Sequence, residues 1–532
     1  MEDRGNVVKL LNKKKRGLLQ KVLFSRLGLI VLLIVLQIFL FLSFFTWFRQ
    51  YLRHYEILRA IFSIAMVLYL FNSSMDSSAK LTWMMIISIV PFIGTAFLFY
   101  SRTNLGQNVL HDKVQEMIRR TRRLLPQKET VLQELERDPY GTEDLHRYLN
   151  REGCFPVYDG TEVTFFPLGE DKFKAMLEEL EKAEDYIFME YFIIEEGLMW
   201  GRILDVLARK AKEGVDVRVM YDGMCEITTL SYDYADRLAK LGIKAKAFSP
   251  VRAFVSTHYN YRDHRKILSI DGKVAFTGGV NLADEYINEK ERFGHWKDTA
   301  VMLKGDAAAS LTLSFLQMWN VTETHPDFGP CEKLAEEQKE TWAAGEGAKT
   351  EGYVMPYADS PLDSDKVGET VYMDLFDRAT DYVHVMTPYL ILDDEMETAI
   401  KYAAQRGVDV KLILPGIPDK KAAYALAKTH YRALTEAGVQ IFEFSPGFVH
   451  AKVCVSDDEK AVVGTINLDY RSLYHHFECA CYLYRCRCVA QIEQDFAETL
   501  AQCRPVTEQT IRATPIGYKL GGTLLKFFAP LM

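Results

Sequence analysis

The chain has 532 residues and a formal net charge of −8, with 64 Lys and Arg against 72 Asp and Glu. This length suffices for two sizeable domains with additional segments, and the acidic balance implies no nucleic-acid partner. The nine cysteines are an odd number without a secretory framework, so we expect free thiols in a reducing compartment. The run CACYLYRCRC (479–488) fits strands better than zinc-ligand spacing, and no metal site is predicted.

The first hundred residues are expected to form a transmembrane region at 27–100. A basic segment, 1–26, precedes the apolar stretch 27–48, which as a helix would be about 33 Å long and cross a bilayer core. That stretch is too long for a signal peptide, and no small-residue cleavage site follows it. Residues 81–100 are predicted to be a second span, and residues 54–71 are either a third span or an interfacial segment.

Basic residues on both sides of this region set the expected topology. The basic N-terminus and the RRTRR segment at 119–123 both favour the cytoplasmic side of the membrane. Both can be cytoplasmic only with an even number of crossings, whereas three crossings would export the large domain. We therefore expect a multi-pass protein of the cell membrane with its large domain on the cytoplasmic side, and linker helices at 101–150.

The remainder of the chain is an internal duplication. Three pairs of segments recur in the same order, and each half alternates β-rich and helical stretches as β-α-β-α-β. The paired segments are EDYIFMEYFII (184–194) with TDYVHVMTPYLIL (380–392), AKEGVDVRVMYD (211–222) with AAQRGVDVKLILP (403–415), and LAKLGIKAKAFSP (238–250) with LTEAGVQIFEFSP (434–446).

This repetition predicts an α/β protein with two domains related by a pseudo-twofold axis. Each domain is expected to hold a mixed sheet flanked by helices. The first domain is predicted at 151–330 and the second at 369–515, with a linker rich in Glu, Lys, Gly and Ala at 331–368. Residues 516–532 are interpreted equally well as an amphipathic interfacial helix and as a packing helix of the second domain.

A His-x-Lys-x4-Asp pattern occurs once in each half. The two copies have identical internal spacing, and each is followed by a Gly-rich turn that ends in asparagine. One such short motif would be a weak signal, but two matching copies are hard to reach by chance. On a strand, the His and Lys of each copy face the same side, so the lysines and the asparagine amides would bind the oxygens of a phosphodiester without metal. The residues are His264, Lys266, Asp271 and Asn281 in the first copy and His450, Lys452, Asp457 and Asn467 in the second.

Two imidazoles on opposite sides of one phosphorus would do different work. One, neutral, would attack phosphorus, and the other, protonated, would give its proton to the departing alkoxide. We predict that Asp298 orients His264 and that Glu478 orients His450. Asp271 and Asp457 complete the motif set of catalytic candidates, but both precede turns and are interpreted as structural, closing the turn or pairing with Lys or Arg. No role is assigned to the histidines without a symmetric counterpart, namely His258, His295, His384, His430, His475 and His476.

The double motif resembles the phospholipase D superfamily. The segments EYFII, YRDHRKILSIDGKVAFTGGVNLADEY and GTINLDYRS, with the apolar N-terminal spans, are similar to bacterial cardiolipin synthases. The resemblance implies a phosphatidyltransferase that converts two phosphatidylglycerol molecules to cardiolipin and glycerol through a phosphohistidine. It further implies that His264 is the nucleophile and His450 the general acid and base.

The same resemblance implies that no nucleotide, metal or other cofactor is needed, because one phosphodiester replaces another. The expected partners are phosphatidylglycerol and cardiolipin in the bilayer, without nucleic acid, and the oligomeric state is left open. The motifs do not encode the acceptor alcohol. A related phosphatidyltransferase or hydrolase with another acceptor is therefore the alternative, and a membrane scaffold with an inactive module is disfavoured by the two complete motifs.

Overall fold

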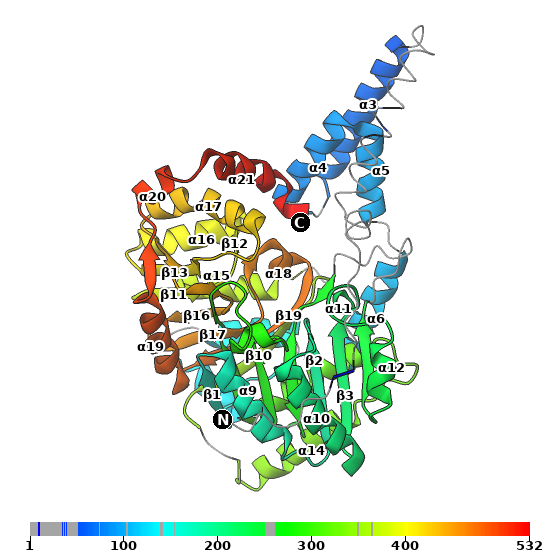
Figure 1. Ribbon diagram of the computed structural model, residues 1–532, viewed down its shortest axis with the longest axis vertical. Coiled ribbons are helices and arrows are strands. Elements are labelled where there is room, and N and C mark those ends of the chain that lie inside the picture. Colours follow the sequence, from blue (N-terminus) through cyan, green and yellow to red (C-terminus); the bar gives the residue numbers. More distant parts are fainter. Residues whose placement is uncertain are drawn as a thin grey trace. The chain divides into compact units, whose positions relative to one another are not determined.

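The computed structural model describes residues 9–10, 35, 37, 39, 52–73, 75–102, 105–138, 142–153, 155–249, 261–347, 350–362 and 365–531. It divides into two compact units (Figure 1). The larger unit comprises Met1–Leu11, Val109–Val251 and Tyr259–Leu525, and the smaller comprises Asn12–Asn108, Arg252–His258 and Lys526–Met532.

The smaller unit contains the helices α3 (Leu52–Phe71), α4 (Ser77–Ile89) and α5 (Pro91–Arg102). The Asp76 carboxylate accepts hydrogen bonds from the backbone N–H groups of Ser78 and Ala79, which fixes the start of α4. A small apolar core joins the three helices. Near the C-terminus, the Phe527 carbonyl accepts a hydrogen bond of 2.9 Å from the Thr82 hydroxyl.

The structure does not show the predicted membrane spans. None of the helices among the described residues has both the length and the apolar character required to cross a bilayer. The stretch 81–100 forms parts of α4 and α5, because Pro91 has no N–H to continue α4 and instead fits the first turn of the next helix. Residues 54–71 lie within α3, and most of the predicted span at 27–48 falls outside the described residues.

The first half of the larger unit forms a mixed sheet in the order β1-β9-β7-β6-β2-β3-β4. The neighbours β2, β3 and β4 are parallel, whereas β1, β9, β7, β6 and β2 pair antiparallel in turn. The strands are β1 (Thr161–Phe166), β2 (Tyr186–Tyr191), β3 (Asp216–Asp222), β4 (Lys244–Phe248), β6 (Lys266–Ile270), β7 (Val274–Gly278) and β9 (Ala300–Gly305).

The second half repeats this topology strand for strand. Its sheet has the order β10-β19-β17-β16-β11-β13-β14, and β20 is added at the β14 edge. The strands are β10 (Tyr353–Asp359), β11 (Tyr382–Met386), β13 (Asp409–Pro415), β14 (Gln440–Phe444), β16 (Val453–Ser456), β17 (Lys460–Gly464), β19 (His476–Tyr484) and β20 (Cys503–Pro505). The predicted duplicated α/β architecture with mixed sheets is confirmed.

Amphipathic helices cover the sheets (Figure 1). In the first half, α9 (Gly169–Leu180) and α10 (Leu198–Glu213) pack apolar side chains against β2, β3 and β6, and α10 ends at Gly214 in the left-handed conformation. The largely buried α13 (Ala308–Asn320) packs against Phe188 of β2. Apolar side chains thus leave water on both sides of the sheet, which supplies most of the folding free energy.

A shared core holds the two sheets against each other. Ile267, Ala275 and Val301 of the first sheet belong to the same buried cluster as Val453 and Val463 of the second. The described cysteines are all unpaired, and Cys479 and Cys481 of β19 lie in this cluster, as expected for alternate positions of a strand. The halves therefore form one compact body around a joint interior.

The segments that were predicted as linkers are also ordered. Residues 101–150 contain α6 (Leu105–Thr121), α7 (Glu129–Leu135) and most of α8 (Thr142–Gly153). Residues 331–368 are not a simple linker, because they contain most of α14 (Gly329–Ala343) and the whole edge strand β10. In α14, Cys331, Leu334 and Ala335 are buried at helical spacing, while its many charged residues cover the outer face.

Candidate active site

The two motifs lie at equivalent places in the two halves. His264 lies two residues before the start of β6, and His450 directly follows β15 (Gly447–Val449), shortly before β16. Both histidines and both motif lysines, Lys266 and Lys452, are buried. Each motif thus places a buried histidine and a buried lysine two residues apart.

Short parallel ladders connect the motif of each half to the other half. β5 (Arg262–Asp263) pairs with His476 and Phe477 of β19, and the N–H of His264 donates to the Phe477 carbonyl at 2.9 Å. Likewise β15 pairs with β8 (His295–Lys297), and the N–H of His450 donates to the Lys297 carbonyl at 2.7 Å. In each ladder the next residue along the partner strand is acidic, Glu478 after Phe477 and Asp298 after Lys297. The strand register places each carboxylate beside the histidine of the other half.

Each histidine is consequently oriented by the opposite half. His264 Nδ1 lies 2.9 and 3.0 Å from the two Glu478 carboxylate oxygens, and His450 Nδ1 lies 2.7 Å from Asp298 Oδ2. The predicted pairing of Asp298 with His264 and Glu478 with His450 was wrong. The physical reason is the exchange of strand segments between halves, which brings together residues far apart in the sequence.

Neighbouring residues hold the two carboxylates in place. The Thr465 hydroxyl donates a hydrogen bond to Glu478, and the N–H of Thr299 donates to Asp298 Oδ1 at 2.9 Å. The equivalent of Thr465 in the first half is Gly279, where a Cβ would come within 2.0 Å of Asp298 Oδ1. The glycine in this turn therefore makes room for the Asp298 carboxylate, which explains one difference between the two Gly-rich turns.

Both lysine side chains fold back onto their own motif. Lys266 Nζ donates to the His264 carbonyl, and Lys452 Nζ donates to the His450 carbonyl. Lys452 Nζ also lies 2.9 Å from His450 Nδ1, beside the Asp298 carboxylate. Lys452 Nζ thus lies beside the His450 imidazole and Lys266 Nζ beside the His264 backbone, where both can neutralise the oxygens of a bound phosphodiester.

Burial dominates the proton affinities of this cluster. It lowers the pKa of Lys266 to about 8 and that of Lys452 to about 7, against the opposing attraction of Glu478 and Asp298 respectively. Burial, reinforced by the lysine charges, also holds the pKa of His264 and of His450 well below the ordinary value of 6.5. Both imidazoles are therefore neutral near pH 7 in the free protein, and each has a lone pair.

The two motif aspartates have a structural role. Asp271 accepts hydrogen bonds of 2.7–2.9 Å from the backbone N–H groups of residues 184–186, and Asp457 accepts bonds of 2.9–3.0 Å from those of residues 380–382. They are not part of the catalytic group, because each lies at the far end of its motif strand and binds the backbone amides that precede β2 or β11. The contacts agree with a structural role, but the partners are amides of a distant segment and neither the turn itself nor Lys or Arg.

The two motif asparagines differ in their contacts. Asn281 accepts a hydrogen bond from the N–H of Ile193 at 3.1 Å and donates to the Tyr286 hydroxyl at 2.8 Å. Asn467 is buried, and its Oδ1 has no hydrogen-bond partner among the described residues. Asn281 therefore also stabilises the loop after β2, and the phosphate-binding role of both amides stays a prediction.

Sequence reasoning missed three buried side chains next to the motifs. The His476 ring lies 5.2 Å from the His264 ring, and the Trp296 ring lies 5.6 Å from the His450 ring. Lys172 of α9 donates to the Val280 carbonyl at 3.3 Å, and burial lowers its pKa to about 7. An alignment of HWKD (295–298) with HHFE (475–478) would have shown that His476 and Trp296 are equivalent positions.

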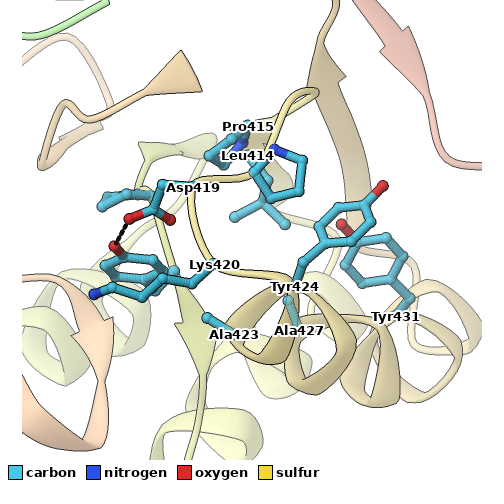
Figure 2. A pocket seen from close by; sticks show the side chains of 11 residues that line it. Leu414, Pro415, Asp419, Lys420, Ala423, Tyr424, Ala427 and Tyr431 are labelled. Atoms are coloured by element: carbon cyan, nitrogen blue, oxygen red, sulfur yellow. Dashed lines mark hydrogen bonds between the residues drawn. The ribbon is translucent and has the colours of Figure 1, made fainter. Parts of the chain in front are cut away.

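A pocket lies at the end of β13 and the start of α17 (Lys421–Glu436) (Figure 2). The Tyr389 hydroxyl donates to Asp419 Oδ2 at 2.7 Å, and Lys420 Nζ lies 4.8 Å from the centre of the Tyr389 ring. After burial and the motif lysines, the Lys420 charge is a further cause of the low pKa of His264 and His450. The pocket is also lined by Pro388, Leu414, Pro415, Pro418, Ala423, Tyr424, Ala427 and Tyr431.

Comparison with known proteins agrees with this geometry. The family described as "Cardiolipin synthase, PLD-like domain" matches residues 176–319 and 372–500. A cardiolipin synthase of Geobacillus sp. is 31% identical over 96% of this chain and 100% of its own length. An uncharacterized protein of Streptococcus mutans is 56% identical over 88% of this chain and 100% of its own length.

The solved structure of a phosphatidylserine synthase from Haemophilus influenzae shares the fold. It superposes with a TM-score of 0.54 at 15% identity, covering 73% of this chain and 97% of that one. The two buried histidine motifs, the family match and the full-length relatives support the same family assignment. The chain is therefore a phosphatidyltransferase enzyme and belongs to the cardiolipin synthase family of the phospholipase D superfamily.

Proposed function

We propose that this enzyme is a cardiolipin synthase that transfers the phosphatidyl group of one phosphatidylglycerol to a second, through a phosphohistidine. The observation that carries the proposal is the pair of buried motif histidines, each hydrogen-bonded through Nδ1 to a carboxylate of the opposite half. At His264 such a bond places the N–H on Nδ1 and leaves the lone pair on Nε2 for chemistry at phosphorus. The name of the full-length Geobacillus relative supports the choice of substrate.

In the first step, Nε2 of His264 attacks the phosphorus of phosphatidylglycerol. A P–N bond forms while the P–O bond to glycerol breaks, and the glycerol alkoxide takes a proton from His450. In the free protein His450 is neutral, but the bound phosphodiester is an anion, and a nearby negative charge raises the pKa of an imidazole. Glu478 stabilises the positive charge that develops on His264.

In the second step, a second phosphatidylglycerol supplies the acceptor hydroxyl. His450 takes the proton of this hydroxyl, the oxygen attacks phosphorus, and the P–N bond breaks to release cardiolipin and neutral His264. Lys266 and Lys452 stabilise the charge on the non-bridging oxygens in both transition states. One phosphodiester replaces another, so the cycle balances without a nucleotide.

Purified enzyme incubated with phosphatidylglycerol alone tests the proposal. We expect cardiolipin and glycerol in equal amounts, identified by mass spectrometry of the lipid and aqueous fractions. Phosphatidic acid as the main lipid product would make the enzyme a hydrolase. A new phospholipid that forms only after another alcohol is added would make the enzyme a related phosphatidyltransferase with a different acceptor.

The lysine pKa values predict a pH dependence. The cationic forms of Lys452 and Lys266 bind the phosphate oxygens, and these forms prevail below pKa values of about 7 and about 8. The value of kcat/KM, which reports on the free enzyme, should therefore fall as pH rises through this range. The anionic substrate raises both pKa values once bound, so kcat should decline only at higher pH.

This profile is measured with phosphatidylglycerol vesicles of constant composition. Lys452→Arg is the informative variant, because a guanidinium stays charged throughout the range and should remove the lower of the two alkaline steps. Values of kcat/KM that stay level from about pH 7 to about pH 9 would contradict the assignment of the two lysines.

We also propose that the enzyme acts at the cell membrane, as a multi-pass protein anchored through residues 27–100 with its catalytic unit on the cytoplasmic side. Both proposed substrates are lipids of the bilayer, so anchoring raises their effective concentration at the site. The C-terminal helix α21 (Ile516–Phe528) adds an interfacial contact. Its side chains Ile516, Leu520 and Leu524 are 74%, 67% and 65% exposed at a spacing of four residues.

The opposite face of α21 packs against α17, so both interpretations of this segment apply. A Cβ at Gly522 would come within 2.4 Å of the Ala425 carbonyl, which shows how closely the two helices approach. In the anchored protein in vesicles, the double substitution Leu520→Gln and Leu524→Gln should raise the hydrogen-exchange rate of the α21 amides by at least about tenfold, since both side chains lose their burial in lipid. Tyr402→Gln on another exposed surface is the control, and equal exchange of α21 in both proteins would contradict the interfacial role.

A further inference from the structure

Three buried side chains at the His264 end of the site can act together as metal ligands. His264, His476 and Glu478 each offer a ligand atom, and these atoms lie within 4.8 Å of one another. Glu478 Oε1 is 2.9 Å from His264 Nδ1 and 3.7 Å from His476 Nδ1. Ligand atoms around a tetrahedral Zn²⁺ at about 2.0–2.2 Å are about 3.4 Å apart, so the cluster needs only small shifts to hold the ion.

His476 is the observation that points to a ligand. Its side chain is only 7% exposed, yet neither ring nitrogen has a hydrogen-bond partner among the described residues. Buried polar groups are nearly always satisfied, because an unpaired one loses its hydration without compensation. The ring packs beside those of His264 and Phe192, at centroid distances of 5.2 and 6.3 Å. A metal ion shared with His264 and Glu478 would occupy the free lone pair of His476.

The position beside His450 in the other half offers no third metal ligand. By the register of the two short ladders, Trp296 stands two residues before Asp298, as His476 stands two residues before Glu478. An indole has no lone pair for a metal. Across the part of the chain that the structure describes, His264, His476 and Glu478 are the only grouping of three such ligands. A metal would therefore bind at His264 and not at His450.

We propose that His264, His476 and Glu478 form an inhibitory site for Zn²⁺ or a similar transition-metal cation. The inhibition rests on the proposed function, in which His264 attacks through Nε2. A neutral imidazole has one N–H and one lone pair. Metal on Nδ1 displaces the proton from that nitrogen and leaves the N–H on Nε2, while metal on Nε2 takes the attacking lone pair directly. Either mode removes the nucleophile.

The donor set also defines which ions act. Two imidazole nitrogens and one carboxylate oxygen with a fourth open position suit Zn²⁺. Mg²⁺ and Ca²⁺ prefer oxygen ligands in higher number, and the site offers a single carboxylate. Zinc should therefore inhibit at concentrations at which magnesium has no effect, and chelation should restore turnover because no covalent bond is changed.

The test uses the purified full-length enzyme after treatment with EDTA, which itself should not lower turnover. Zinc chloride is added while binding is followed by calorimetry and cardiolipin formation by mass spectrometry. We expect one zinc ion per chain and a loss of turnover of at least about tenfold that EDTA reverses, with no such effect of magnesium. Absence of saturable zinc binding would overturn the proposal.

Two variants separate this site from adventitious binding. His476→Phe keeps a ring in the same space but offers no ligand, so it should lose both zinc binding and zinc inhibition relative to its own zinc-free rate. Trp296→Phe is the matched control at the equivalent position of the other half and should respond to zinc as the wild type does. Unchanged zinc inhibition in His476→Phe would contradict the proposal.

A binding readout keeps the two proposals apart. If the enzyme makes no cardiolipin but still binds zinc through His476, the metal site stands and the proposed reaction fails. If cardiolipin forms and zinc neither binds nor inhibits, the metal site fails and the reaction stands. Should His476→Phe not fold, cobalt bound to the wild-type protein serves instead, and an absorption spectrum without tetrahedral character would count against the site.

Discussion

Replacing His264 with alanine should abolish the covalent lipid–phosphate adduct and lower turnover by at least about a thousandfold. In the proposed mechanism the imidazole supplies the lone pair that forms the P–N bond, and Glu478 at 2.9 Å from its Nδ1 has no such role at phosphorus. The adduct is measured by rapid acid or base quench of enzyme mixed with labelled phosphatidylglycerol, followed by mass analysis of the intact protein.

His476→Ala is the matched control for this experiment, since it removes a buried imidazole whose ring lies 5.2 Å from that of His264. This variant should still form the adduct, because the nucleophile and its carboxylate remain. An adduct of normal amount in His264→Ala would place the nucleophile elsewhere in the site.

Methionine at Lys266 or at Lys452 should each lower kcat by roughly a hundredfold or more, the scale of losing one donor to a developing oxyanion. Methionine fills a similar volume without charge. Burial already disfavours the ammonium, lowering the pKa to about 8 at Lys266 and about 7 at Lys452, so removing the charge should not lower the melting temperature.

Lys172→Met tests whether any buried lysine near the motifs has the same effect. Lys172 donates to the Val280 carbonyl and not to a motif histidine, so its loss should reduce turnover much less. Near-normal turnover in both motif-lysine variants would refute their role at the phosphate. A large drop in melting temperature alongside the lost activity would make that role structural instead.

The repeated motif and the duplicated topology could be predicted from the sequence because they depend on local patterns. Alternation placed the His and Lys of each motif on one face, and the turn after each motif strand identified Asp271 and Asp457 as structural. Their actual partners, the backbone amides of the segments before β2 and β11, belong to strands distant in the sequence. Local reasoning therefore identified the role but not the contacts.

The pairing of carboxylates with histidines could not be predicted in the same way. Asp298 and Glu478 follow the two motifs at comparable sequence distances, which favours pairing within each half. The structure decides otherwise because β5 pairs with β19 and β15 with β8, so each half completes the other. This is a property of how the sheets meet, and it follows from packing between segments far apart in the sequence.

Two further differences have similar causes. The segment 331–368 has the composition of a linker, yet the buried spacing of α14 and the pairing of β10 with β19 order it. His476 has no histidine counterpart, but it occupies the position of Trp296 beside the other motif histidine. The pairing of β10 becomes visible only in the structure, whereas the equivalence of His476 and Trp296 could also be read from an alignment of HWKD with HHFE.

The most direct test of the crossed site is a rapid-quench experiment with a phosphatidyl ester of p-nitrophenol, whose leaving group needs no proton from His450. Glu478→Gln should slow the burst of nitrophenol, because Glu478 orients the nucleophile His264 from the opposite half. Asp298→Asn should keep the burst and slow only the later transfer, because Asp298 serves His450. The reverse pattern, with the burst lost in Asp298→Asn and kept in Glu478→Gln, would contradict the account.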